Sequence, residues 1–169
     1  MKNVLHILTL IIISSLCFCV SCAQSGESSD TNESGLSCRV SITCATVFDN
    51  RDKLTSGKDE IIPEDGFILH ETEVALSGGE SAFDVLLKTT RDLGIHMEHS
   101  KTPVYKSSYI EGINNLYEFD CGELSGWTYK VNGLVPDHGC SQQILAPGDA
   151  VEILYTCDLG ADVGGVLYQ

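Results

Sequence analysis

The sequence predicts an α+β fold, a mixed sheet with one helix packed across one face. Residues 82–93 have the apolar period of a helix, whereas several other stretches alternate as strands do. The helix follows two predicted strands and precedes several more, and Asn-Gly and Pro-Gly pairs separate the last two strands. With 169 residues, the chain has room for one such domain and a short targeting segment.

The N-terminus is predicted to be an export signal covering residues 1–21. Lys2 is its one charged residue, and the apolar run that follows is too short to span a membrane as a mature helix. Val20-Ser21-Cys22 resembles the cleavage motif of lipoproteins, so we expect Cys22 to carry lipid, with ordinary cleavage after Ala23 as the alternative. The expected location is the outer face of the cell membrane, or the medium if the ordinary cleavage applies.

Residues 22–37 are rich in Ser, Gly and acidic side chains, which predicts a flexible tether. The formal net charge of the chain is −14. Nucleic acid is therefore not an expected partner, because phosphate backbones are bound by clustered Lys and Arg. The sequence contains no nucleophile elbow, phosphate loop or dinucleotide fingerprint, so we expect a protein that is not an enzyme.

The folded domain is predicted to span residues 38–169. Its first two strands are expected at 39–48 and 67–76, with a charged loop at 49–60 between them. The alternation of the second strand is broken around Glu71.

The helix at 82–93 has clear end signals. Ser81 is the expected N-cap with Asp84 three residues later, and Gly94 ends the helix. Its apolar stripe, which includes Leu86 and Leu93, is expected to face the sheet. Residues 95–99 and 109–119 are predicted to be extended.

The most informative stretch is 125–158. Trp127, Tyr129 and Val131 place large side chains on one strand face, and Asn132-Gly133 then accepts the positive φ of a turn. A Pro-Gly-Asp turn leads into residues 150–156, which are apolar enough on both faces to lie in the middle of a sheet.

These motifs resemble the C-terminal domain of the cobalamin carriers transcobalamin and intrinsic factor, in the form found in bacterial surface proteins of unassigned function. The resemblance covers roughly the last two-thirds of the chain and implies a β-grasp fold. It implies a corrinoid such as cobalamin as a ligand, with no cofactor. The vertebrate carriers enclose their ligand between a large α-helical barrel and the small β domain. This chain has no sequence for the barrel, so affinity should be weak unless a partner protein supplies the other half.

We therefore predict a cell-surface module that binds a soluble ligand, and the alternative is a structural or adhesive domain that binds partner proteins. The predicted ligand-binding residues are aromatic and loop residues in or near the hairpin: Trp127, Tyr129, Tyr117, Asn132, Pro136 and His138. Rings with one or two directed polar groups suit a small-molecule site. The same pattern also describes a packed core, and a lone Trp in a small domain is usually buried.

Five cysteines lie in the predicted domain: Cys38, Cys44, Cys121, Cys140 and Cys157. In an exported chain whose mature part has no C-x-x-C, they predict disulfides rather than metal ligands or catalytic thiols. Cys121 and Cys140 flank the hairpin and are expected to pair. Cys157 ends the last strand, which in a β-grasp runs parallel beside the first, so Cys44 is its expected partner. The histidines are scattered, and no metal site is expected.

Overall fold

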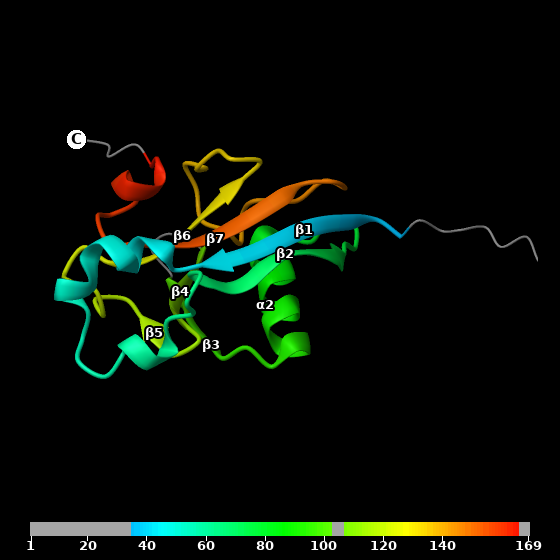
Figure 1. Ribbon diagram of the computed structural model, residues 1–169. Coiled ribbons are helices and arrows are strands. Elements are labelled where there is room, and N and C mark those ends of the chain that lie inside the picture. Colours follow the sequence, from blue (N-terminus) through cyan, green and yellow to red (C-terminus); the bar gives the residue numbers. More distant parts are fainter. Residues whose placement is uncertain (1–34, 103–106, 166–169) are drawn as a thin grey trace, which may run out of the picture. The chain divides into compact units, whose positions relative to one another are not determined.

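The core of the fold is a four-stranded mixed sheet with the order β2-β1-β7-β6. The computed structural model of this chain describes residues 35–102 and 107–165 (Figure 1). The strands are β1 (Ser37–Thr43), β2 (Phe67–Ala75), β6 (Gly126–Val131) and β7 (Ala150–Thr156). β1 and β7 are parallel, whereas β1–β2 and β6–β7 are antiparallel. The α+β class is confirmed, and the last strand runs beside the first as a β-grasp requires.

Helix α2 (Ala82–Leu93) has the predicted ends. Ser81 Oγ accepts from the Asp84 amide at 3.2 Å, Asp84 Oδ2 accepts from the Ser81 amide at 2.9 Å, and Gly94 ends the helix at a φ of 68°. Leu86 is fully buried in the same core as the sheet strands. Leu93, predicted to face the sheet, is 53% exposed, because the buried stripe of the helix ends at Thr90.

Three strands after the helix form a separate antiparallel sheet with the order β3-β4-β5, rather than joining one mixed sheet as predicted. They are β3 (Met97–Thr102), β4 (Ser107–Ile113) and β5 (Leu116–Tyr117). The predicted extended segment 109–119 is a hairpin, because Asn114 and Asn115 adopt φ values of 51° and 62°. Gly112 pairs with Tyr117, and a Cβ there would lie 2.6 Å from the tyrosine ring, so glycine lets this ring lie across β4.

The predicted strand 39–48 ends early, at Thr43. The Cys44 amide donates to Gly66 O at 2.8 Å, and the chain then turns into the 3-10 helix η1 (Ala45–Lys53), where Val47 is fully buried. A second 3-10 helix, η2 (Asp59–Ile61), occupies the end of the predicted charged loop.

The ends of the predicted strands show two further details. The register of β1 against β2 shifts between Val40 and Ile42, which adds a residue to β2 where the alternation is broken. β1 begins at Ser37, one residue before the predicted domain boundary.

The predicted signal peptide (residues 1–21), the lipidation site Cys22 and most of the tether lie outside the described residues. Within the part of the chain that the structure describes, no helix combines the length and hydropathy needed to cross a membrane.

Candidate functional site

A surface groove of about 530 Å³ lies where β4, β6 and two loops meet. Tyr109 of β4 and Thr128 of β6 line it, together with Pro136 and His138 from the loop after β6 and Leu159 from the segment after β7. A hollow of about 180 Å³ shares Tyr109 and Thr128 with this groove. Two of the six residues predicted from the sequence, Pro136 and His138, therefore line the groove directly.

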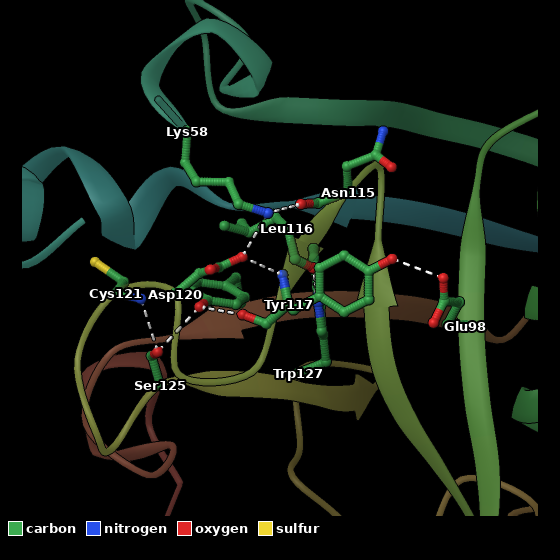
Figure 2. Close-up of polar contacts among 10 residues, drawn as sticks. Lys58, Glu98, Asn115, Leu116, Tyr117, Asp120, Cys121, Ser125 and Trp127 are labelled. Atoms are coloured by element: carbon green, nitrogen blue, oxygen red, sulfur yellow. Dashed lines mark hydrogen bonds and ion pairs between the residues drawn. The ribbon is translucent and has the colours of Figure 1, made fainter. Parts of the chain in front are cut away.

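Trp127 lies below this surface, as part of the core. Its ring is 8% exposed, and its Nε1 donates to Leu116 O at 2.9 Å (Figure 2). The indole also meets the Tyr155 ring edge-to-face, with centroids 5.1 Å apart. Trp127 lines only the smaller hollow, so of its two sequence interpretations, packed core and open platform, the structure has the core.

Tyr129 has a similar supporting position. It is 7% exposed, it lines the smaller hollow, and its hydroxyl donates to His138 O at 2.8 Å. Burial raises the pKa of Tyr129. Its neutral hydroxyl therefore anchors the loop that carries His138.

Tyr117 lies away from the groove, on the short strand β5. Its hydroxyl donates to Glu98 Oε1 at 2.7 Å, and Lys58 Nζ lies 5.0 Å from its ring centroid (Figure 2). The hydrogen bond to Glu98 raises the pKa of Tyr117. Tyr117 lines neither the groove nor the smaller hollow, so the structure does not bring it together with the groove residues.

Asn132 is a turn residue whose side chain stabilises the connection between β6 and β7. Its φ is 53°, its Nδ2 donates to Asp149 Oδ1 at 2.8 Å, and its Oδ1 accepts from the Ala150 amide at 2.9 Å. These bonds join the end of β6 to the start of β7. Asn132 lies outside the lining of the groove.

The loop that carries His138 is held against β4 at several points. A Cβ on Gly139 would lie 1.8 Å from Ser107 Oγ, so only glycine allows this close approach. Ser141 Oγ accepts from the Ser108 amide at 3.0 Å, and Phe83 at the start of α2 donates to Cys140 O at 3.1 Å. The loop is therefore a fixed wall of the groove.

His138 is oriented by polar contacts on both sides of its ring. Its Nδ1 lies 2.9 Å from Asp137 Oδ1, and its Nε2 lies 2.9 Å from Gln143 Oε1. The hydrogen bond to His138 lowers the pKa of Asp137, which keeps a carboxylate charged at this rim.

Tyr109, Thr128 and Leu159 are among the groove residues that sequence reasoning missed. The Tyr109 hydroxyl donates to Glu118 Oε2 at 2.5 Å, and burial together with that carboxylate raises its pKa to about 12. Its ring stays 40% exposed and offers an apolar surface. These residues come from three separate segments, so no local pattern could have grouped them.

Leu159 belongs to a set of exposed apolar side chains on adjoining loops. Phe119, Leu124 and Leu159 are 61%, 47% and 62% exposed. The Leu159 amide donates to Leu124 O at 2.9 Å, and the Phe119 amide donates to Ser125 O at 3.1 Å. Phe119 and Leu159 have φ values of 68° and 49°. Positive φ values are uncommon for large side chains, and backbone strain of this kind often occurs at functional sites.

The disulfide pairings predicted from the sequence, Cys121–Cys140 and Cys44–Cys157, stay predictions. Cys38 and these four cysteines are free and buried. The Cys140 thiol donates to Ser108 O at 3.7 Å, whereas the Cys121 thiol lies beside Cys157. Cys140 contacts β4 and α2, whereas Cys121 contacts η1, so the contacts of these two residues give the predicted Cys121–Cys140 pairing no support.

In the ranges 35–102 and 107–165, no three His, Cys, Asp or Glu side chains are grouped so that they could hold a metal ion. Histidines 96 and 138 instead contact single carboxylates, those of Glu98 and Asp137.

Comparison with known proteins gives a limited set of similarities. Residues 79–156, from just before α2 to the end of β7, match a family described as a domain of unknown function (DUF4430). No protein with a curated description matches the sequence. A solved structure of haptocorrin in complex with Cbi shares 16% identity and has a TM-score of 0.50. That match covers 73% of this chain and 25% of haptocorrin, so the chain spans about a quarter of that protein.

A solved protein from Ruminococcus gnavus, described as metal-binding, also matches, with 14% identity and a TM-score of 0.41. The match covers 71% of this chain and 95% of the Ruminococcus gnavus protein. The haptocorrin match, at its low identity, shows a likeness of fold alone. The chain thus has a segment similar to DUF4430 and a fold similar to part of haptocorrin, a protein of the transcobalamin family.

Proposed function

We propose that this domain is a non-catalytic module that binds a small soluble ligand in the groove between β4, β6 and the His138 loop. The observation that carries the proposal is the groove itself. Its volume of about 530 Å³ lies within the range of small-molecule sites, roughly 300–1,000 Å³. Its lining combines the apolar surfaces of Tyr109, Pro136 and Leu159 with the polar groups of Thr128 and His138.

This lining suits a ligand with a flat apolar face and polar edges. The Tyr109 ring and the Leu159 side chain offer contact area and stay partly exposed. The Asp137 carboxylate supplies a charged rim beside the His138 ring, and Tyr129 and Gln143 already fix the loop that carries both. A preformed site of this kind loses little conformational entropy on binding.

The specific ligand that we propose is a corrinoid, with cobinamide as the first choice. The solved haptocorrin contains Cbi, cobinamide, which supports testing this class first. The present chain spans 25% of haptocorrin, so its groove would contact the ligand from one side. We therefore propose weak binding by the isolated domain and stronger binding when a partner protein covers the other side.

A titration of the purified chain with cobinamide and with cobalamin, followed by calorimetry, tests this function. His138→Ala removes a ring that lines the groove and the partner that orients Asp137, at a cost of about 1 kcal/mol, so it should weaken binding roughly fivefold. Leu159→Ala should weaken it by a similar factor through lost apolar contact. Leu93→Ala is the matched control, because Leu93 is 53% exposed on α2 and lies outside the groove lining. The proposal fails if His138→Ala and Leu159→Ala bind both corrinoids as tightly as the wild type.

A second candidate function, binding of a partner protein at the cell surface, is favoured by the exposed set Phe119, Leu124 and Leu159. Exposed apolar patches on soluble domains commonly mark interaction sites. The double variant Phe119→Asp, Leu124→Asp should then reduce the attachment of labelled domain to intact cells, measured by flow cytometry. Cobinamide binding by the same variant should be unchanged, which separates this function from the first.

A further inference from the structure

Three buried thiols lie at the end of the main sheet where β1, β7 and the corner after β5 come together. They belong to Cys44, Cys121 and Cys157. Cys44 directly follows β1, Cys157 directly follows β7, and Cys121 lies in the corner between β5 and β6. Segments far apart in the sequence therefore bring these sulfur atoms into one region.

Two of the three thiols are held by the same 3-10 helix. The Cys121 thiol donates to Asn50 O at 3.3 Å, and the Cys157 thiol donates to Thr46 Oγ1 at 3.8 Å. Asn50 Nδ2 in turn donates to Thr46 O at 3.0 Å, so the two residues that hold the thiols are themselves joined by a hydrogen bond. The thiols of Cys121 and Cys157 also lie close enough to each other that each affects the pKa of the other.

We propose that Cys121 and Cys157 are a disulfide-forming pair that covalently joins the corner after β5 to the end of β7. In the reaction each sulfur loses its hydrogen and one S–S bond forms. The two electrons and two protons pass to an external disulfide, which is reduced to two thiols. The proposal does not depend on the identity of the ligand.

The other cysteines are less suitable partners. Cys140 donates to Ser108 O, and its carbonyl accepts from Phe83 at the start of α2, so it lies in a different part of the core. Cys157 has only a minor effect on the pKa of Cys44, whereas Cys121 is the cysteine that acts on the pKa of Cys157.

The proposed bond would fasten two loops that carry the exposed apolar set. Cys121 follows Phe119 by two residues, and Cys157 precedes Leu159 by two residues. The segment after β7 is already held by Asp162, whose Oδ2 accepts from the Cys157 amide at 2.7 Å. A covalent link at this point would hold the groove wall formed by Leu159 in one position relative to the corner loop.

The environment of the thiols sets when the bond can form. Burial raises the pKa of Cys121 above its usual value, and burial with the Cys121 contact raises the pKa of Cys157 to about 12. Thiol exchange needs the thiolate, so the folded, reduced protein should react slowly at neutral pH and faster as pH rises. The bond should therefore form mainly during folding.

The connectivity can be read by refolding the reduced full chain in a glutathione redox mixture, alkylating free thiols and mapping peptides without reduction. We expect one linked peptide pair, Cys121 with Cys157, lighter than the free peptides by two hydrogen atoms. Cys38, Cys44 and Cys140 should be alkylated. A Cys121–Cys140 link, a Cys44–Cys157 link or complete alkylation of all five residues would overturn the proposal.

Thermal unfolding gives a second readout that does not need the peptide map. The oxidised wild type should melt at a higher temperature than the reduced wild type. This difference should vanish in Cys121→Ser and persist in the matched control Cys140→Ser. A difference that survives in Cys121→Ser would contradict the pairing, and if that variant does not fold, the peptide map of the wild type still decides.

Discussion

The two sheets of this domain are stabilised in different ways. The four-stranded sheet is built on apolar burial: Val40 and Ile42 of β1 and Val151 and Ile153 of β7 are at most 1% exposed. The outer side of the three-stranded sheet depends instead on directed polar contacts, among them Tyr117 with Glu98. The groove lies between the two sheets. Substitutions at the rim of the groove are therefore expected to leave the apolar core of the main sheet intact.

Two hydrogen bonds connect these regions. Trp127 on β6 donates to Leu116 O (Figure 2). The hydroxyl of Tyr155 on β7 donates to Tyr117 O at 2.7 Å. Both donors are buried in the main sheet, and both acceptors are backbone carbonyls of β5. The position of the second sheet is thus specified by the aromatic residues of the first.

The largest expected effect comes from breaking this connection at Trp127. Trp127→Ala should lower the free energy of unfolding by about 3–5 kcal/mol, because it removes a buried ring. Trp127→Phe is the matched variant, since it keeps most of the apolar contact and loses the hydrogen bond to Leu116 O, at a cost of about 1–2 kcal/mol. Urea denaturation measures both. An alanine variant that loses less than the phenylalanine variant would show that the ring is not part of the core.

An intermediate effect is expected from the ion pair between Lys58 and Asp120, which supports the second sheet. The charged atoms are 3.0 Å apart, and the side chains are 25% and 14% exposed. Asp120 Oδ2 also accepts from the Tyr117 amide at 2.8 Å (Figure 2). Lys58→Met should cost about 1–3 kcal/mol, because it leaves a carboxylate of low exposure without its charged partner.

The ion pair of Arg51 with Asp59 provides the control for that experiment. Its atoms are 3.1 Å apart, but the side chains are 49% and 61% exposed. Arg51→Met should therefore change stability by less than about 1 kcal/mol. Equal effects of the two methionine variants in urea denaturation would contradict the view that polar contacts specify the second sheet.

The same contrast explains how far the sequence could predict the fold. The ends of α2 were predicted because the Ser81–Asp84 cap and the Gly94 stop are local signals. The turn at Asn132 was predicted for the same reason. The parallel pairing of β1 and β7 followed from the order of elements in a β-grasp. The separate second sheet was missed, because the pairing of β3 with β4 depends on contacts that alternation alone does not encode.

The candidate site was only partly predictable. Pro136 and His138 were chosen from a loop motif, and they lie on the groove. Trp127 could be core or platform from its strand pattern, and only its position under β5 separates these roles. Tyr109 and Leu159 carry no local signal of a site, because the fold brings them together from opposite ends of the domain's second half.

The smallest expected effect concerns acid stability, and it compares one glutamate from each region. Hydrogen bonding to the Ser77 amide, with the Lys88 contact, lowers the pKa of Glu80 near α2. Hydrogen bonding to the Tyr117 hydroxyl, with the His96 contact, lowers the pKa of Glu98 on β3. Because both pKa values are lower in the folded state, each contribution is present above the unfolded glutamate pKa, about 4.3, and is lost as pH falls through the folded value.

Glu80→Gln should therefore reduce stability at neutral pH and flatten the loss of stability below about pH 5, where the wild type takes up protons. Glu98→Gln should do the same to a smaller extent, because the Glu98 side chain is 51% exposed and water screens its contacts, whereas that of Glu80 is 21% exposed. Urea denaturation of both variants between pH 3 and pH 7 measures the difference. If the free energy of unfolding of Glu80→Gln fell more steeply with decreasing pH than that of the wild type, Glu80 would not be stabilised as a carboxylate in the folded state.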